Sequence, residues 1–132
     1  MCPETQWRLL MRPMSGTLLA LALLTAPATA GAAPAVKPKA FAMCGVCHKV
    51  TPNAASAMGP GLWEVGGRKA GSVVGFAYSP ALKSSKIVWT RDNLIAFVTN
   101  PKAKVPGTRM AFAGLKNPQD AAEVADYLLS LK

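Results

Sequence analysis

Cys44-Gly45-Val46-Cys47-His48 places two thiols and an imidazole within five residues. Two thiols at this spacing can each add across one of the two vinyl groups of a single haem. The histidine directly after the second thiol is then held beneath the iron as an axial ligand. The pattern C-x-x-C-H is the sequence signature of this covalent, c-type attachment. We therefore expect one haem c, bound through Cys44 and Cys47, with His48 ligating the iron.

Three other interpretations of this motif explain less. A thioredoxin-like redox pair needs a preceding strand and a βαβ pattern, and neither is visible in the sequence. A structural zinc site needs four Cys or His ligands. Apart from Cys2, which lies in a segment expected to be removed, the chain offers only Cys44, Cys47 and His48. A disulfide between the two thiols is possible but leaves the adjacent His48 unexplained.

Residues 1–30 have the pattern of a secretory signal peptide. Arg8 and Arg12 form a basic start, a leucine-rich apolar run follows, and Ala28-Thr29-Ala30 matches the small-residue cleavage pattern. The alternative is an uncleaved anchor helix. The apolar run from Met14 to Ala26 has 13 residues, short of the ~20 that span a bilayer. We expect export to the periplasm, cleavage near residue 30, and no membrane-spanning segment in the mature chain.

The mature chain is small and basic. Removing residues 1–30 from 132 leaves 102, enough for one domain. The 15 basic and six acidic residues fall to 13 and five without Arg8, Arg12 and Glu4, a net charge of +8. An exported protein rarely meets nucleic acid, and the basic residues are scattered, so an acidic protein partner is the favoured interpretation. A surface that only confers solubility is the alternative.

The sequence pattern predicts an all-α domain over residues 39–132. Residues 31–38 are rich in Ala and Pro and form a flexible leader, and residues 39–47 form a short helix with Phe41 on its inner face. Residues 51–79 contain many Gly and Pro residues without a sustained period, so we expect loops packed on a large cofactor.

Two stronger helices follow. The first has Thr90 as N-cap and ends at Asn100-Pro101. The second begins at Asn117-Pro118 and is apolar at i, i+3, i+4, i+7 and i+8 from Ala121, a face expected to pack against the helix that carries Phe41. No convincing strand is visible, and we expect about four to five short helices in all.

A second axial ligand must come from a methionine, because His48 is the only histidine. Outside residues 1–30 the methionines are Met43, Met58 and Met110. Met43 precedes the attachment motif and Met58 follows it closely, and both are predicted to be ordinary core residues. Met110 lies 62 residues beyond His48, in the turn Pro106-Gly107-Thr108-Arg109-Met110, which can aim its thioether inward. Met110 is therefore the predicted ligand.

Over residues 40–132 the chain resembles the class I c-type cytochromes, particularly the soluble bacterial and mitochondrial kind. The resemblance rests on several blocks in order: CGVCH at 44–48, MGPGLWEVGGRKAG at 58–71, GFAYS at 75–79, VWT at 88–90, NPKAKVPGTRMAFAGL at 100–115, and a final helix with Tyr127. Spaced blocks in the right order are more specific than one pentapeptide. The resemblance implies the small cytochrome c fold, wrapped around one haem.

The family's pattern also implies roles for further residues. Pro60 would accept a hydrogen bond at its carbonyl from the outer ring nitrogen of His48, fixing the ring. Tyr78, Trp89 and Arg68 would bind or neutralise the inner haem propionate, and Thr108 would order the loop before Met110. The chain departs from the family at three places: Phe97 and Leu82 stand where tyrosine and asparagine are common, and Pro38 precedes a first helix without the usual glycine.

We interpret the chain as a periplasmic, monomeric electron carrier of a respiratory or photosynthetic chain, not an enzyme, because a six-coordinate iron has no open site. By resemblance a quinol–cytochrome reductase donates the electron, and an oxidase, a peroxidase or a reaction centre accepts it. Two alternatives remain. One is a haem enzyme or gas sensor with an open distal site, and the other is a fixed haem subunit of a larger oxidoreductase.

Overall fold

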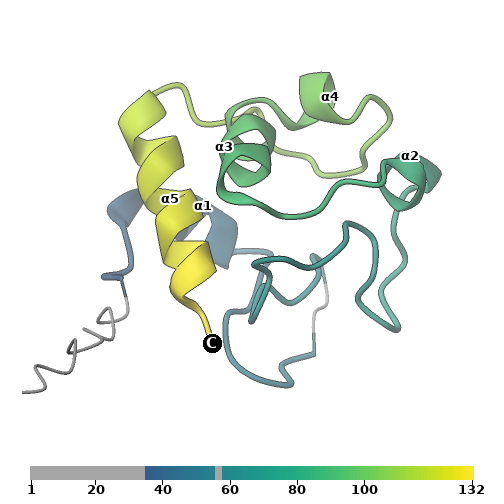
Figure 1. The fold of residues 1–132 in the computed structure, drawn as a ribbon, viewed down its shortest axis with the longest axis horizontal. Coiled ribbons are helices and arrows are strands. Elements are labelled where there is room, and N and C mark those ends of the chain that lie inside the picture. The colour runs from purple at the N-terminus through teal and green to yellow at the C-terminus, as the bar shows by residue number, and fades with distance from the viewer. Residues whose placement is uncertain (1–34, 56–57) are drawn as a thin grey trace, which may run out of the picture. The chain divides into compact units, whose positions relative to one another are not determined.

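A computed structural model describes residues 35–55 and 58–132. The signal peptide predicted for residues 1–30 and the first part of the leader, 31–34, lie outside the described residues. The described residues form a 3-10 helix and five α-helices: η1 Lys39–Phe41, α1 Ala42–Gly45, α2 Pro80–Ser84, α3 Arg91–Thr99, α4 Pro101–Lys104 and α5 Pro118–Ser130 (Figure 1). Within this part of the chain the only β-structure is an isolated bridge between Lys69 and Val88. The all-α prediction is confirmed.

The two stronger helices begin where their capping residues predict. The side chain of Thr90 accepts a hydrogen bond from the N–H of Asn93 at 3.3 Å, and that of Asn117 accepts one from the N–H of Gln119 at 3.0 Å. Each bond satisfies a backbone donor that has no partner within the first turn. Pro118 follows its cap at the first helical position, where a missing N–H costs nothing.

Two short helices were not predicted. The hydroxyl of Ser79 caps α2, which starts at Pro80, and the side chain of Asn100 caps α4, which starts at Pro101. The prediction treated Asn100-Pro101 only as the end of the preceding helix. That end is confirmed at Thr99, but the same pair also begins α4.

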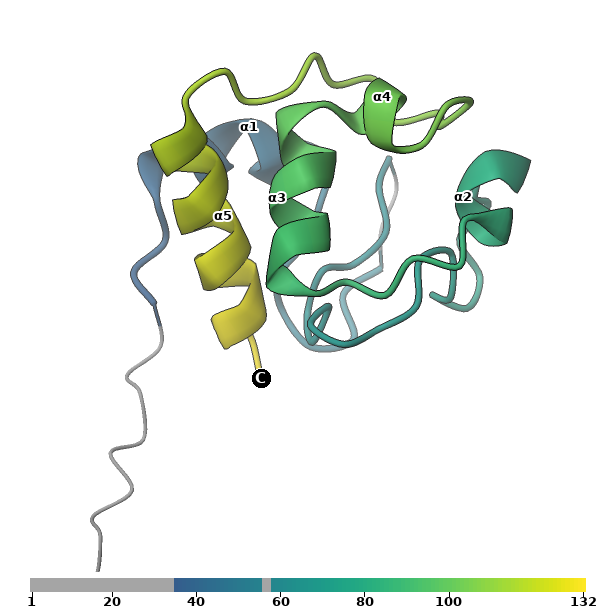
Figure 2. The ribbon, with the colours of Figure 1, turned by 45° about the horizontal axis from the view of Figure 1, so that its top comes forward.

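The helical core lies where α5 packs against α3 and η1. Helices α5 and α3 run side by side in both ribbon views (Figures 1 and 2). Ala121, Val124 and Ala125 have no exposed surface. The ring of Phe41, only 1% exposed, meets the ring of Tyr127 edge to face with centroids 5.0 Å apart. The predicted packing of the last helix on the segment carrying Phe41 is confirmed.

A surface ion pair also joins α3 to α5. The guanidinium of Arg91 donates to both carboxylate oxygens of Asp126, at 2.6 and 2.9 Å. The Arg91 guanidinium lowers the pKa of the Asp126 carboxyl. Because both side chains are about half exposed, the pair orients the helices but adds little stability.

The helix predicted over 39–47 consists of η1 and α1 and ends at Gly45, before the second cysteine. Residues 51–55 and 58–79 run as turns and loops, as predicted, and one short backbone pairing anchors them. The N–H of Trp89 donates to the carbonyl of Arg68 at 2.9 Å, and the N–H of Ala70 donates to the carbonyl of Ile87 at 2.8 Å. This pairing fixes Arg68 and Trp89 beside each other although 21 residues separate them in sequence.

Candidate haem site

The attachment motif closes on itself through the carbonyl of Cys44. That oxygen accepts hydrogen bonds from the N–H of Cys47 at 3.1 Å and from the N–H of His48 at 2.9 Å. The resulting turn after α1 brings all three side chains to the wall of one cavity. Burial raises the pKa of the Cys44 thiol, and a backbone hydrogen bond partly offsets this. The thiol is therefore protonated near neutral pH.

The imidazole of His48 has a fixed orientation. Its Nδ1 lies 2.8 Å from the carbonyl oxygen of Pro60. A carbonyl can only accept, so Nδ1 carries the proton and Nε2 keeps a free lone pair. A histidine that ligates a metal commonly donates its other ring N–H to such an oxygen, which sets the tautomer and raises the basicity of the ligand.

Gly59 lets the backbone pass against the face of this ring, and the sequence interpretation did not single it out. Its N–H donates to the carbonyl of Cys47 at 3.1 Å. A Cβ at this position would lie 2.6 Å from Cε1 and 2.7 Å from Nδ1 of His48. These separations are far inside ordinary carbon contact distances of about 3.5–4.0 Å. The glycine directly before Pro60 was the signal available in the sequence.

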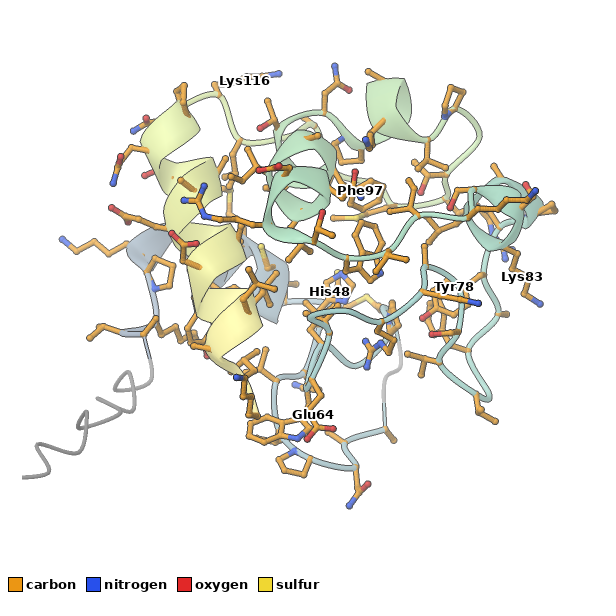
Figure 3. The ribbon with its side chains drawn as sticks, viewed as in Figure 1. His48, Glu64, Tyr78, Lys83, Phe97 and Lys116 are labelled. Atoms are coloured by element: carbon orange, nitrogen blue, oxygen red, sulfur yellow. The ribbon has the colours of Figure 1, made fainter. Side chains whose placement is uncertain are left out.

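One cavity of about 600 Å³ brings the predicted site residues together. This volume lies within the usual range for cofactor pockets, about 300–1,000 Å³. Its walls are mostly apolar and include Leu62, Leu94, Phe97 and Phe112. Figure 3 shows the labelled side chains of His48, Tyr78 and Phe97 around this central region. All nine residues predicted for the site line it: Cys44, Cys47, His48, Pro60, Arg68, Tyr78, Trp89, Thr108 and Met110.

Met110 reaches the cavity at the end of a short segment, residues 105–110, which we call the methionine loop. The N–H of Thr108 donates to the carbonyl of Val105 at 3.0 Å and closes a turn. The hydroxyl of Thr108 then accepts a hydrogen bond from the N–H of Met110 at 3.3 Å. Met110 is partly buried and packs against the hydrophobic core. An imidazole nitrogen and a thioether on one apolar cavity are the donor set of cytochromes c.

Polar groups gather at another part of the wall. Arg68 donates to the carbonyls of Gly61 at 2.7 Å and Trp63 at 2.9 Å, contacts that the sequence did not reveal. Burial raises the pKa of the Tyr78 phenol, whereas a hydrogen bond with the backbone of Val73 and the charge of Arg68 lower it. Tyr78 is therefore protonated at neutral pH and can donate a hydrogen bond, and the charge of Arg68 lies close to it. A hydrogen-bond donor beside a cation suits a bound anionic group.

The prediction for the other two methionines was wrong. Met43 is 54% exposed and Met58 is 66% exposed, so neither is a core residue. Met43 precedes Cys44 on the short α1, and Met58 directly precedes Gly59, the residue whose backbone passes against the His48 ring. Both still border the cavity.

Other kinds of site receive no support from the described residues. In that part of the chain no three Cys, His, Asp or Glu side chains come together to hold a bare metal ion. Over the same ranges no helix has the length and apolar character that crossing a membrane requires.

Relatives of known identity are similar over most of the chain, although no family model matches it. The chain is 46% identical over 104 residues to cytochrome c2 of Rhodomicrobium vannielii, covering 79% of this chain and 83% of the relative. It is 42% identical over 118 residues to cytochrome c2 of Blastochloris viridis, covering 89% and 92%. Among solved structures, cytochrome cH from Methylobacterium extorquens superposes with a TM-score of 0.63 at 42% identity, covering 68% of this chain and 90% of that one.

Proposed function

Because the chain belongs to the class I c-type cytochromes, electron carriers with one covalent haem c, we propose that Cys44 and Cys47 bind the haem and that His48 and Met110 hold its iron. The observation that carries this proposal is the convergence of all four side chains on one apolar cavity. The fixed tautomer of His48 supports it, because Nε2 is the ring nitrogen left free to ligate.

Attachment needs only the chain's own thiols and the two vinyl groups. Each S–H would add across one C=C bond, so that a thioether would form and the thiol hydrogen would end on the neighbouring carbon, without an oxidant. The turn centred on the Cys44 carbonyl brings the two thiols and the imidazole of His48 to the wall of the same cavity. All three side chains could therefore hold one haem.

The cavity wall favours a reversible one-electron carrier. Haem supplies the redox change, and the protein tunes its potential through the axial ligands and the polarity of the surroundings. Apolar side chains such as Leu94 and Phe97 solvate the additional positive charge of the ferric state poorly. They favour the reduced state, as does a weakly donating thioether. We propose that Tyr78, Trp89 and Arg68 offset the propionate charge at the polar part of the wall.

We propose a mobile carrier in the periplasm, with residues 1–30 as a cleaved signal peptide, 31–38 as a leader and 39–132 as the cytochrome domain. Its partners would be a quinol–cytochrome reductase as donor and an oxidase, a peroxidase or a reaction centre as acceptor. Exposed lysines would meet acidic groups on these proteins and steer the encounter. The proposed docking residues are Lys49, Lys102, Lys104 and Lys116, all of them exposed.

Two measurements test the assignment. Acid–acetone extraction should leave the haem with the protein, and Cys44→Ala should retain at most one thioether, with a shifted absorption band in the reduced state. Haem found in the solvent would refute covalent attachment. The ferric spectrum should contain the weak far-red band of methionine–iron ligation, and Met110→Ala should abolish it. Met43→Ala and Met58→Ala are matched controls that should keep it, and loss of the band in either control instead of Met110→Ala would refute the ligand.

A further inference from the structure

The methionine loop, residues 105–110, is anchored at its first residue, because Val105 is buried in the core at 3% exposure and its N–H donates to the carbonyl of Pro101 at 2.9 Å. The hydrogen bonds that shape it, from Thr108 to Val105 and from Met110 to Thr108, are local. Gly107, at a φ of +87°, lies so close to α2 that a Cβ there would be 3.2 Å from the Cβ of Ala81. The turn is therefore well defined, but beyond Val105 only apolar packing, of Gly107 on the short α2 and of Met110 on the core, opposes movement of residues 106–110 away from the cavity.

Arg109 makes the one polar contact described between this loop and a distant segment. Its Nη2 donates to the carbonyl oxygen of Ala77 at 2.7 Å, and 32 residues separate the two in sequence. Ala77 belongs to the segment that leads into α2. Its neighbours Phe76 and Tyr78 stabilise that segment through an edge-to-face contact with ring centroids 4.8 Å apart. Arg109 directly precedes Met110, and Ala77 directly precedes Tyr78. Their hydrogen bond therefore joins the segment that carries Met110 to the segment that carries Tyr78.

This contact lies at the wall of the cavity. Arg109 and Ala77 both line it, as do Met110 and Tyr78 beside them. A guanidinium donating to a carbonyl is among the stronger hydrogen bonds, because the donor is charged. Both residues are exposed, so water competes for the bond and its net contribution falls at the lower end of the range for charged partners. Such a bond can bias an equilibrium of the loop without being essential for folding.

We propose that Arg109 is a positioning residue for Met110: its bond to Ala77 holds the methionine loop closed and so keeps the thioether on the iron. The inference rests on the proposed ligation by Met110. A thioether binds ferric iron weakly, so an external ligand gains access whenever the loop opens. Without the bond, the open population should rise roughly tenfold, the effect of losing one solvent-exposed, charged hydrogen bond.

Imidazole is a suitable probe, because it binds ferric haem only where the methionine has left. Its apparent affinity then scales with the open fraction of the loop. We would measure its binding at neutral pH by absorption and stopped flow in the full haem-loaded protein, for the wild type, Arg109→Leu and Arg109→Lys. The leucine variant should bind imidazole roughly tenfold more tightly and correspondingly faster. The lysine variant keeps the charge and one donor and should recover most of the wild-type behaviour.

Lys39→Leu is the matched control. Lys39 is exposed on η1 and lies outside the residues that line the cavity. Its loss removes the same charge without separating two segments, so imidazole binding should stay at the wild-type value. An equal effect in this variant would attribute the change to net charge and overturn the proposal.

Two further outcomes are distinct. If Arg109→Leu binds imidazole with wild-type affinity and rate while the far-red band is present, Met110 ligates and Arg109 does not position it. If the wild type itself lacks the far-red band and binds imidazole without a slow opening step, the assignment of Met110 is wrong and this inference fails with it. Thermal unfolding of each variant, followed by circular dichroism, establishes that the compared proteins are folded.

Discussion

Gly59→Ala should destabilise the haem site from the histidine side. The new Cβ would lie 2.6 Å from Cε1, 2.7 Å from Nδ1 and 3.0 Å from Nε2 of His48. A long side chain could swing away from such a clash. This ring cannot do so freely, because the Pro60 carbonyl holds it at Nδ1 and the proposed iron holds it at Nε2. Either the ring must tilt or the backbone at residue 59 must retreat.

Both responses cost stability. Overpacking of this kind costs about 1–3 kcal/mol, and weakening the hydrogen bond from His48 to Pro60 adds about 0.5–1.5 kcal/mol. The sum is about 1.5–4.5 kcal/mol. For a domain of this size 1 kcal/mol corresponds to roughly 4–8 °C in Tm, so we expect Tm to fall by at least about 6 °C.

The assay is thermal unfolding of the haem-loaded protein, followed by circular dichroism and by the haem absorption. Gly45→Ala is the control within the same motif, because a Cβ there meets only Cε1 of Phe41 at an ordinary 3.9 Å. In a helix that change should be neutral or slightly stabilising. A Gly59→Ala protein with the Tm of the wild type would show that the ring is not confined as described.

Three other perturbations test separate parts of the molecule. Electron transfer with an isolated quinol–cytochrome reductase should slow steeply with added salt, because the Debye length shrinks to about 10 Å near 0.1 M; a rate independent of salt would count against acidic docking sites. Phe41→Ala should lower the free energy of unfolding by about 3–5 kcal/mol, since its side chain is 1% exposed against Tyr127, and denaturant titration would reveal a loss below 1 kcal/mol as a contradiction. Asp126→Asn should cost a small amount of stability at pH 7. Because the folded pKa of Asp126 is lowered by Arg91, its contribution is complete above the ordinary value of 3.8 and is lost as pH falls through the lower folded value. Wild type and variant should therefore converge once the pH is below the folded pKa of Asp126, and a difference that persists there would not come from this ion pair.

The sequence predicted the site better than the path of the chain around it. A covalent haem restricts which residue types can serve, so five letters at 44–48 and one suitably placed methionine were enough to propose the attachment and the ligands. The helix starts at Thr90 and Asn117 were predictable for a similar reason, because a side-chain cap followed by an apolar period is a local signal. Both kinds of prediction depend on chemistry within a few residues.

What the sequence did not reveal depends on contacts between distant segments. The pairing of Arg68 with Trp89 and the closeness of Gly59 to the His48 ring require a folded backbone. The exposure of Met43 and Met58 was missed because hydrophobicity predicts burial only on average, and a small domain has too few side chains to cover every apolar group. Helices α2 and α4 are a different case. Ser79-Pro80 and Asn100-Pro101 carry the same cap-and-proline signal as Asn117-Pro118, but too few apolar residues follow to form a period.

Asn100 has a consequence for how this chain can change in length during evolution. The residue ends α3, where its N–H bonds to the carbonyl of Ala96, and its side chain also caps α4. Directly opposite, Gly114 lies against the Thr99 carbonyl so closely that no side chain would fit. An inserted or deleted residue at this joint would break two helix ends and a close backbone contact at once. We expect natural length variation to spare residues 99–101 and to concentrate in the exposed turn at 51–53, where the chain has no comparable contacts to lose.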